Sequence, residues 1–322
     1  MEYRSVSDLN MCLVRNLYRL PRDIDLVVGV PRSGLLPANL IALHLNLPLT
    51  DLKGLIEQRL IASGPRMGRR IESFDDVKRV LVVDDSVNSG AEMKRVRALL
   101  EEENPDCEIV LLAIYVTPGA EDFVDMWLEH IPMPRVFGWN AMHHANSTVT
   151  CFDIDGVLCR DPTETENDDG DAYREFLLNV EPLFIPTREL GALVTSRLEK
   201  YRDLTETWLA KHGVQYKELV MLDLPTKEDR MRLGNHAEFK AAAYRERTWA
   251  KLFIESSASQ AQDIANLSVK PVLCIETDTM RVPNMKALTR ATANKVGRKI
   301  GNTVESAKQR MKEKMLEWNR WQ

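Results

Sequence analysis

Cysteine is scarce in this sequence of 322 residues, and the cysteines present are scattered. No two of them form a C-x-x-C pair, and the five are Cys12, Cys107, Cys151, Cys159 and Cys274. An odd number at such wide spacing argues against both a disulfide framework and a zinc site. The sequence therefore indicates reduced thiols and a cytoplasmic protein.

Long apolar runs are missing as well. No stretch reaches the roughly 18–20 apolar residues that a membrane-spanning helix needs. The N-terminus carries Glu2, Arg4 and Asp8, which a secretory signal peptide would not have at these positions. A net charge of −5 argues against binding of nucleic acid by the chain as a whole. We find no internal repeat.

What remains is the composition of an ordinary globular protein, with 44% hydrophobic and 28% charged residues. The length exceeds that of a usual single domain and predicts two. We expect α/β domains over residues 1–146 and 147–281, followed by a helical tail over 282–322. Near the start, leucines at helical spacing predict a helix over residues 7–20 with Ser7 as its N-cap.

Residues 79–90 dominate the first half of the chain. An apolar run ends in two carboxylates, Asp84 and Asp85, and a helical pattern follows the small residues Ser86, Val87, Asn88, Ser89 and Gly90. This order predicts a buried strand, a polar loop and a helix. Ligands bind at the carboxyl ends of strands in such sheets. Free N–H groups at a helix start favour an anion, and adjacent carboxylates accept hydrogen bonds from vicinal hydroxyls. The acidic pair and the loop together suit the binding of a sugar phosphate.

This stretch resembles the phosphoribosyl-diphosphate (PRPP) motif of the type I phosphoribosyltransferases. The resemblance implies that Asp84 and Asp85 bind the ribose hydroxyls and that residues 86–90 bind the 5-phosphate. Ser86 stands where the family more often has Thr or Val, and Ser89 where it has Thr or Ser. The alternative is a buried strand followed by an acidic turn.

A second loop of the same construction precedes it. Residues 25–30 predict a strand that runs into Arg32, Ser33 and Gly34, and an apolar helix follows. The loop resembles the pyrophosphate loop of the same family, which implies that these three residues face the diphosphate of PRPP, with Mg²⁺ bound alongside. Between the two loops, residues 63–70 resemble the family's mobile basic loop, and Arg69 and Arg70 would neutralise the leaving pyrophosphate. The alternative is a solvated surface loop.

A new strand is expected over residues 148–152, and it delivers Asp153 and Asp155. Two carboxylates two residues apart at a strand end supply one nucleophile, one acid/base and ligands for a divalent cation. Residues 153–158, DIDGVL, resemble motif I of the haloacid dehalogenase superfamily. The resemblance implies that Asp153 attacks phosphorus and that Asp155 protonates the leaving alcohol.

The other motifs of that superfamily follow in order. By resemblance, Thr195 binds the phosphoryl group, Lys240 neutralises phosphate and nucleophile, and Mg²⁺ is held by Asp153, Asp155 and Glu255. A single Glu255 followed by Ser256 departs from the common paired-Asp form and puts the second metal ligand in doubt. The intervals 153–195 and 195–240 leave little room for a cap domain, so we expect a capless, open site.

Residues 282–322 carry ten Lys or Arg and three Glu. Their apolar residues recur at helical spacing, which predicts a basic amphipathic helix, weakened by Gly297 and Gly301. Such a helix suits an anionic membrane surface at the inner face of the membrane. The alternative is packing on its own domain or in a homodimer.

Together the resemblances imply an α/β protein with two Rossmann-like domains of mainly parallel strands. A transferase that uses PRPP leaves a 5-phosphate on its product, and a phosphatase in the same chain removes it. We therefore expect a ribofuranosyl group on a saccharide or lipid-linked glycan, as in bacterial pathways that use a phosphoribosyltransferase and a separate phosphatase. The alternatives are a nucleotide-metabolism enzyme, acting on a nucleobase and then a nucleotide, and a PRPP-sensing regulator.

Overall fold

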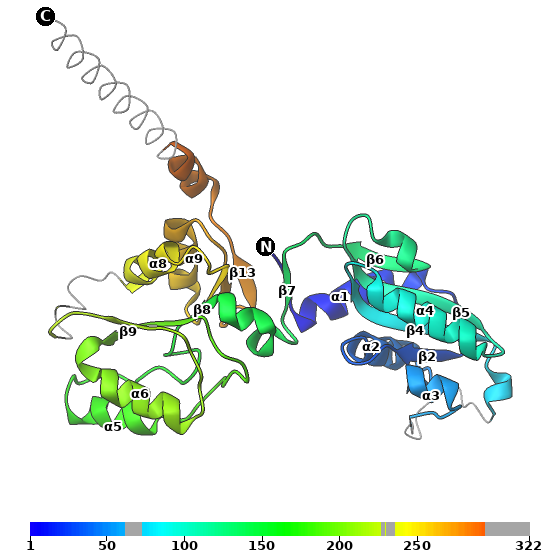
Figure 1. Ribbon diagram of the computed structural model, residues 1–322, viewed down its shortest axis with the longest axis horizontal. Helices are drawn as coiled ribbons and strands as arrows, with labels where there is room; N and C mark the ends of the chain where they lie inside the picture. The colour runs from blue at the N-terminus through cyan, green and yellow to red at the C-terminus, as the bar shows by residue number, and fades with distance from the viewer. Residues whose placement is uncertain (62–72, 227–228, 230–235, 294–322) are drawn as a thin grey trace, which may run out of the picture. The chain divides into compact units, whose positions relative to one another are not determined.

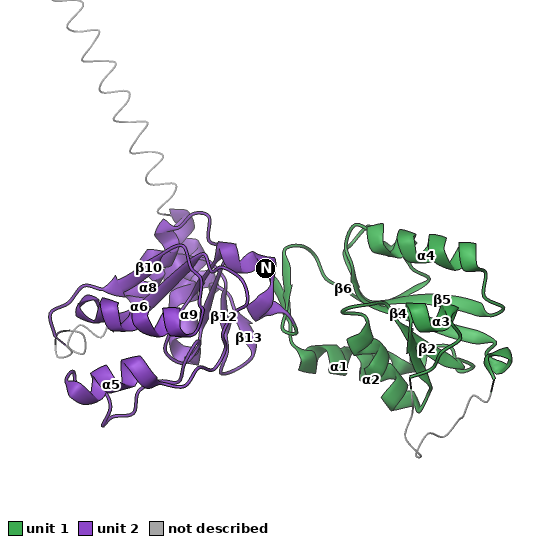
Figure 2. Cartoon of the chain, turned by 60° about the horizontal axis from the view of Figure 1, so that its bottom comes forward, with its two compact units in different colours: residues 1–139 green, residues 140–322 purple. Residues whose placement is uncertain are grey.

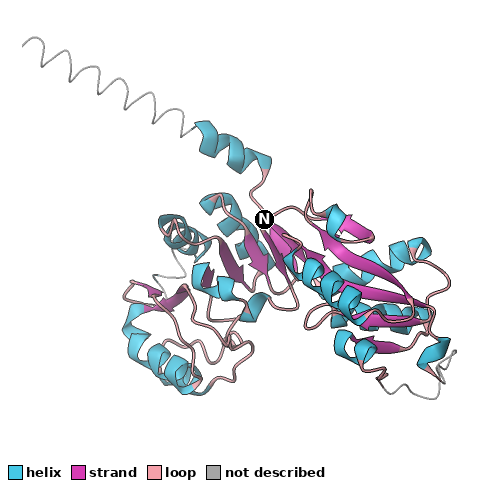
Figure 3. Cartoon of the chain, turned by 45° about the vertical axis from the view of Figure 1, so that its right-hand side comes forward, coloured by secondary structure: helices cyan, strands magenta, loops and turns pink. Residues whose placement is uncertain are grey.

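The computed structural model describes residues 1–61, 73–226, 229 and 236–293 (Figure 1). The chain divides into two compact units, residues 1–139 and 140–322, which are taken in turn below (Figure 2). Both are α/β, with mainly parallel sheets, as the sequence predicts (Figure 3). Among the described residues, no helix is long and apolar enough to cross a membrane.

The first unit is built on a five-stranded parallel sheet in the order β3-β2-β4-β5-β6. The strands are β2 (Leu26–Gly29), β3 (Leu49–Asp51), β4 (Arg79–Val87), β5 (Glu108–Val116) and β6 (Met126–His130). The helices are α1 (Val6–Asn16), α2 (Leu35–Leu45), α3 (Leu52–Ile56) and α4 (Ala91–Glu103), with short 3-10 turns at Leu17–Arg19, Phe74–Asp76 and Glu121–Phe123. β4 is central, which explains its continuous apolar run.

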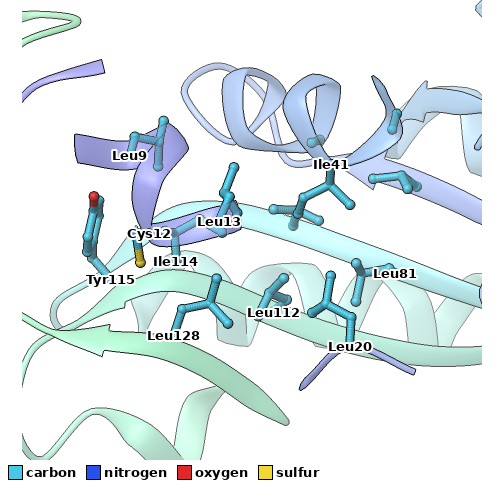
Figure 4. Packing of buried hydrophobic residues seen from close by; sticks show 14 of the residues in the cluster. Leu9, Cys12, Leu13, Leu20, Ile41, Leu81, Leu112, Ile114, Tyr115 and Leu128 are labelled. Carbon is cyan, nitrogen blue, oxygen red and sulfur yellow. The ribbon is translucent and has the colours of Figure 1, made fainter. Parts of the chain in front are cut away.

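Two apolar clusters fill the two faces of this sheet. One joins α1 and α2 to the strands through residues such as Leu13, Ile41 and Leu112, all 0% exposed (Figure 4). The other joins α4 to the opposite side chains of β2 and β4 through Met93, Val96 and Val82. Alternate residues of β4, Leu81 and Val82, enter different clusters, because successive side chains of a strand point to opposite faces.

A small parallel pair closes the first unit. β1 (Glu2–Arg4) lies beside β7 (Arg135–Phe137), and the Gly138 N–H donates to the Arg4 carbonyl at 2.9 Å. α1 then begins in a capping box, in which Ser5 and Asp8 exchange hydrogen bonds. The prediction of Ser7 as the cap was wrong, because Ser5 is followed by an acid at the third helical position that completes this box. The α-helix also ends at Asn16 instead of running to residue 20.

The second unit carries a six-stranded sheet in the order β10-β9-β8-β11-β12-β13, parallel except for β13. Its strands are β8 (Thr150–Phe152), β9 (Ala192–Leu198), β10 (Leu219–Leu222), β11 (Leu252–Glu255), β12 (Val272–Cys274) and β13 (Thr279–Arg281). The helices are α5 (Asp171–Asn179), α6 (Arg202–Lys211), α8 (His236–Glu246) and α9 (Ala258–Ser268), with 3-10 turns at Ala141–His143, Ala145–Val149 and Glu199–Tyr201. Residues 285–293 are also helical.

The helices of the second unit pack in two pairs, α8 with α9 and α5 with α6 (Figure 1). α8 and α9 cover buried strand residues such as Phe253 and Val194. The α6 residue Trp208, 0% exposed, donates from its indole nitrogen to the Val180 carbonyl just after α5. In the fully described stretch between Asp153 and Thr195, α5 is the only helix, so this interval contains no cap domain.

Candidate functional sites

The first candidate site lies where β2 and β4 end. Asp84 and Asp85 are 6% and 5% exposed. The Ser33 hydroxyl donates to Asp85 Oδ1 at 2.9 Å, and the Trp139 indole N–H donates to Asp85 Oδ2 at 3.1 Å. The two loops singled out in the sequence therefore meet at one carboxylate, although 52 residues separate Ser33 from Asp85.

Gly34 makes this meeting sterically feasible. A Cβ at Gly34 would lie 2.5 Å from the Val83 carbonyl oxygen and 2.6 Å from that of Val30, closer than a real Cβ can come. The loop is also tied to β4 because the Val30 N–H donates to the Val83 carbonyl at 2.9 Å. The peptide bond between Pro31 and Arg32 is cis, and the Arg32 side chain is exposed.

The loop predicted to bind phosphate differs from expectation in one respect. The strand does not stop before the carboxylates, because β4 continues to Val87 and pairs with β5 as far as Val116. The Val87 side chain is buried in the core, so only the backbone of this residue could contact a ligand. Asn88 and Ser89 are exposed, and Ser86 is half-buried. Gly90 then begins α4 with a φ of 73°, a conformation that favours glycine.

Burial of two adjacent carboxyl groups sets the electrostatics here. Burial, together with the charge of Asp85, raises the pKa of Asp84 to about 8. The backbone N–H of Asp85 donates to Asp84 Oδ1 at 2.9 Å and opposes that shift. A buried acidic pair of this kind gains from hydroxyl donors or a cation.

Three aromatic rings form a stack beside Asp85. Phe137 lies against Trp139 with ring centroids 4.5 Å apart, and against Tyr115 at 5.5 Å. Arg135 lies over the Phe137 ring and donates to the Thr117 hydroxyl at 3.0 Å, and this hydroxyl in turn donates to the Asn88 amide oxygen. The bond from Trp139 to Asp85 was missed in the sequence, since 54 residues separate the two and no motif joins them. Arg69 and Arg70 lie outside the described residues.

The second candidate site lies at the carboxyl ends of β8 and β11, which are neighbours in the sheet. The Lys240 ammonium group from α8 lies 2.6 Å from Asp153 Oδ2 and 2.7 Å from Glu255 Oε2. All three side chains are buried, and Gln260 Oε1 accepts a third hydrogen bond from Lys240 at 3.1 Å. Three of the sequence-predicted residues thus meet in one buried cluster.

Backbone donors fix the remaining oxygens of these carboxylates. The Ile154 N–H donates to Asp153 Oδ1, and the N–H groups of Ser256 and Ser257 donate to Glu255 Oε1. Burial raises the pKa of Asp153 to about 7, while Lys240 opposes the shift. The pKa of Lys240 is raised because its two carboxylate partners outweigh burial.

Asp155 is bound by a residue that the sequence analysis overlooked. The Arg197 side chain, 0% exposed, reaches Asp155 Oδ1 from Nη2 at 2.6 Å and both oxygens from Nε at 3.1 and 3.2 Å. Thr195, two residues earlier on β9, is fully buried, and its hydroxyl accepts the Arg197 N–H at 3.3 Å. The only available signal was the position of Arg197 immediately after the Thr-Ser pair.

The oxygen donors of Asp153, Asp155 and Glu255 suit Mg²⁺ chemically. Among the described residues, however, no three His, Cys, Asp or Glu side chains group closely enough to hold a metal ion. Asp153 and Glu255 share Lys240, and Asp155 is turned to Arg197. The three predicted ligands therefore do not converge on one point in this structure, and Mg²⁺ at this site stays a prediction.

Comparison with known proteins bears on the first unit. Residues 5–130 match the family model described as a phosphoribosyl transferase domain. A xanthine-guanine phosphoribosyltransferase of Chromohalobacter salexigens is 31% identical over 113 residues, 34% of this chain and 64% of that protein. The chain thus spans less than two thirds of that relative. The N-terminal part has the phosphoribosyltransferase-type fold that the resemblance implies.

Among solved structures, a xanthine-guanine-hypoxanthine phosphoribosyltransferase of Helicobacter pylori is 21% identical, with a TM-score of 0.33, and the match covers 43% of this chain and 92% of that one. A purine phosphoribosyltransferase of Pyrococcus horikoshii is 22% identical, with a TM-score of 0.31 and the same two coverages.

Proposed function

We propose that the first unit transfers 5-phosphoribose from PRPP to an acceptor. The observation that carries this proposal is the meeting of the two loops at Asp85, which receives Ser33 from one loop and lies beside Asp84 in the other. In the proposed complex the acidic pair accepts hydrogen bonds from the ribose hydroxyls. The N–H groups at the start of α4 and the exposed Ser89 hold the 5-phosphate, since a helix N-terminus attracts anions.

The second unit, in this proposal, is a phosphomonoesterase that removes the 5-phosphate. An oxygen of Asp153 attacks phosphorus, the ester oxygen leaves with a proton from Asp155, and an aspartyl-phosphate forms. Water then attacks phosphorus, gives its proton to Asp155 and releases inorganic phosphate. Lys240 supports this role, because a cation 2.6 Å from Asp153 stabilises the ionised nucleophile in a buried site.

The two activities in sequence would leave an unphosphorylated ribofuranosyl group on the acceptor. We propose a saccharide or lipid-linked glycan as that acceptor. This choice is supported by the interval from Asp153 to Thr195, whose one helix, α5, is too little for a cap domain. A site without a cap admits the end of a large substrate while the rest stays outside.

A second candidate has its own support. The curated relative named above is a xanthine-guanine phosphoribosyltransferase, which favours a nucleobase as acceptor and a nucleotide as the phosphatase substrate. A PRPP-sensing regulator ranks last, because a buried Asp153–Lys240–Glu255 cluster has no role in sensing PRPP.

The test is incubation of the full chain with labelled PRPP and Mg²⁺, offering saccharides and nucleobases side by side, with mass analysis of products. We expect a saccharide to gain an anhydropentose with the wild type, and an anhydropentose phosphate with Asp153→Asn. The exposed Asp171→Asn serves as control. Conversion of a purine or pyrimidine base to its nucleoside, with no saccharide modified, would favour the nucleobase as acceptor over the glycan. No consumption of PRPP would reject both.

A further inference from the structure

The second unit carries a pocket of about 630 Å³ whose described lining contains none of Asp153, Asp155, Lys240 and Glu255. The end of α8, the end of α9 and residues 284–291 line it. The 284–291 segment is fixed to the body of the unit. The Asn284 N–H donates to Asn266 Oδ1 at 3.0 Å, and the Gln262 side chain donates to the Val282 carbonyl at 3.1 Å.

The lining of this pocket has one sign of charge. Arg245, Lys286 and Arg290 contribute to it, and the described lining contains no acidic residue. Within the described part of the chain, Lys286 and Arg290 have no ion pair or side-chain hydrogen bond. Arg245 donates only to the Leu267 carbonyl, at 3.4 Å. Three cations held near one another repel, so the pocket is complementary to an anion.

The same region exposes large apolar side chains. Leu267 and Val269, which line the pocket, are 39% and 36% exposed. A free inorganic anion has no use for these side chains, whereas an anionic lipid surface matches both properties, since it offers phosphates above an apolar interior.

We propose that this face of the second unit, the lipid-facing pocket, binds an anionic phospholipid surface. The head-group phosphates contact Arg245, Lys286 and Arg290, and Leu267 and Val269, which line the same pocket, meet the boundary between head groups and acyl chains. The proposal concerns the folded, described residues, and it stands apart from residues 294–322. A glycan acceptor carried on a lipid would be presented at the same surface, although the proposal does not depend on that acceptor.

The experiment measures flotation of the full chain with vesicles of phosphatidylcholine alone or mixed with phosphatidylglycerol, at low and at high salt. We expect binding only to the mixed vesicles and only at low salt. The triple variant Arg245→Gln, Lys286→Gln and Arg290→Gln should bind at least about tenfold more weakly, since each basic residue near such a surface contributes about 1 kcal/mol. Leu267→Ser with Val269→Ser should weaken binding several-fold without a change of charge.

A matched control neutralises the exposed Lys211, Lys217 and Lys251 of the same unit, which removes equal charge elsewhere, and every variant is checked for an unchanged melting temperature. Equal loss in this control would overturn the proposal in favour of unspecific charge attraction. Failure of the wild type to float with mixed vesicles would also overturn it. Full displacement by millimolar inorganic phosphate, with no effect of the Leu267 and Val269 changes, would overturn the proposal in favour of a site for a soluble anion.

Discussion

The indole nitrogen of Trp139 lies 3.1 Å from Asp85 Oδ2, so the last residue of the first unit holds a carboxylate of the proposed PRPP site. Ser33 holds the other oxygen at 2.9 Å. The orientation of Asp85 thus depends on one hydrogen bond from a loop and one from an aromatic stack.

Trp139→Phe removes the donor and keeps a ring for the stack with Phe137. We expect KM for PRPP to rise several-fold with a smaller change in kcat, because a buried carboxylate that loses one donor is less well oriented. Trp127→Phe is the control, since the Trp127 ring packs against His130 and makes no described contact with Asp85. Steady-state kinetics with a fixed acceptor measure KM for PRPP and kcat in the two variants and the wild type. An unchanged or lower KM for PRPP would contradict the role given to Trp139.

Asp84→Ala combined with Asp85→Ala should stop transfer from PRPP and leave hydrolysis of a preformed phosphoribosyl product intact. The reason is that Asp85 accepts hydrogen bonds from Ser33 and Trp139 within the first unit, whereas Asp153 and Lys240 belong to the second. Transfer and phosphate release are assayed separately on the same preparation. Substantial transfer by the double variant would refute the assignment of the acidic pair.

Arg197→Gln should lower kcat for phosphate release by more than it raises KM, because Asp155 loses the group that orients it. Removing one partner of a buried pair should also cost roughly 3–5 kcal/mol of stability. Arg197→Lys keeps the charge and should recover part of the lost kcat and part of the lost stability. Kinetics are measured well below the melting temperature, with Arg160→Gln, at an exposed pair with Glu166, as control. If kcat stays at the wild-type value in Arg197→Gln, the arginine is structural only.

The raised pKa of Asp84 predicts a pH dependence of stability. Its ordinary value is 3.8 and its folded value is about 8, so between these pH values the folded chain retains a proton that the unfolded chain has released. Stability from this group is present below about pH 4 and is lost as pH rises through about 8. Asp84→Asn, whose amide does not ionise, should melt at a higher temperature than the wild type above pH 8. Near pH 4 the difference between the two melting temperatures should be smaller. Thermal scans without PRPP test this, with the exposed Asp122→Asn as control. Parallel curves for wild type and Asp84→Asn would rule it out.

Gly90→Ala and Gly119→Ala form a matched pair. Both glycines have positive φ, 73° and 91°. A Cβ at Gly90 would lie 2.1 Å from the Phe123 ring, whereas a Cβ at Gly119 meets nothing within 4 Å. We expect Gly119→Ala to cost about 1 kcal/mol from backbone strain alone, and Gly90→Ala to cost clearly more and to weaken PRPP binding. Melting temperature and PRPP titration measure these effects, and equal losses in the two variants would argue against a special role for Gly90.

The sequence predicts the elements better than the contacts between them. The run at 80–83 is a buried central strand because strands covered on both faces are continuously apolar, and that pattern is local. Asp153 and Lys240 are 87 residues apart, and only the resemblance suggested that they meet. The bonds of Trp139 and Arg197 to carboxylates depend on strand register and on the path of a distant loop, which no local pattern encodes.

The pairing of β1 with β7 has a consequence for synthesis of the chain. Residues 2–4 are synthesised before the rest of the unit, yet their sheet partners are residues 135–137, at the other end of the unit. The first unit therefore completes its fold only after nearly all of its residues have emerged, because a contact of such long sequence separation cannot form earlier. A peptide fused ahead of Met1 would adjoin this closing strand, so a tag at the opposite end is the better choice for preparing the protein.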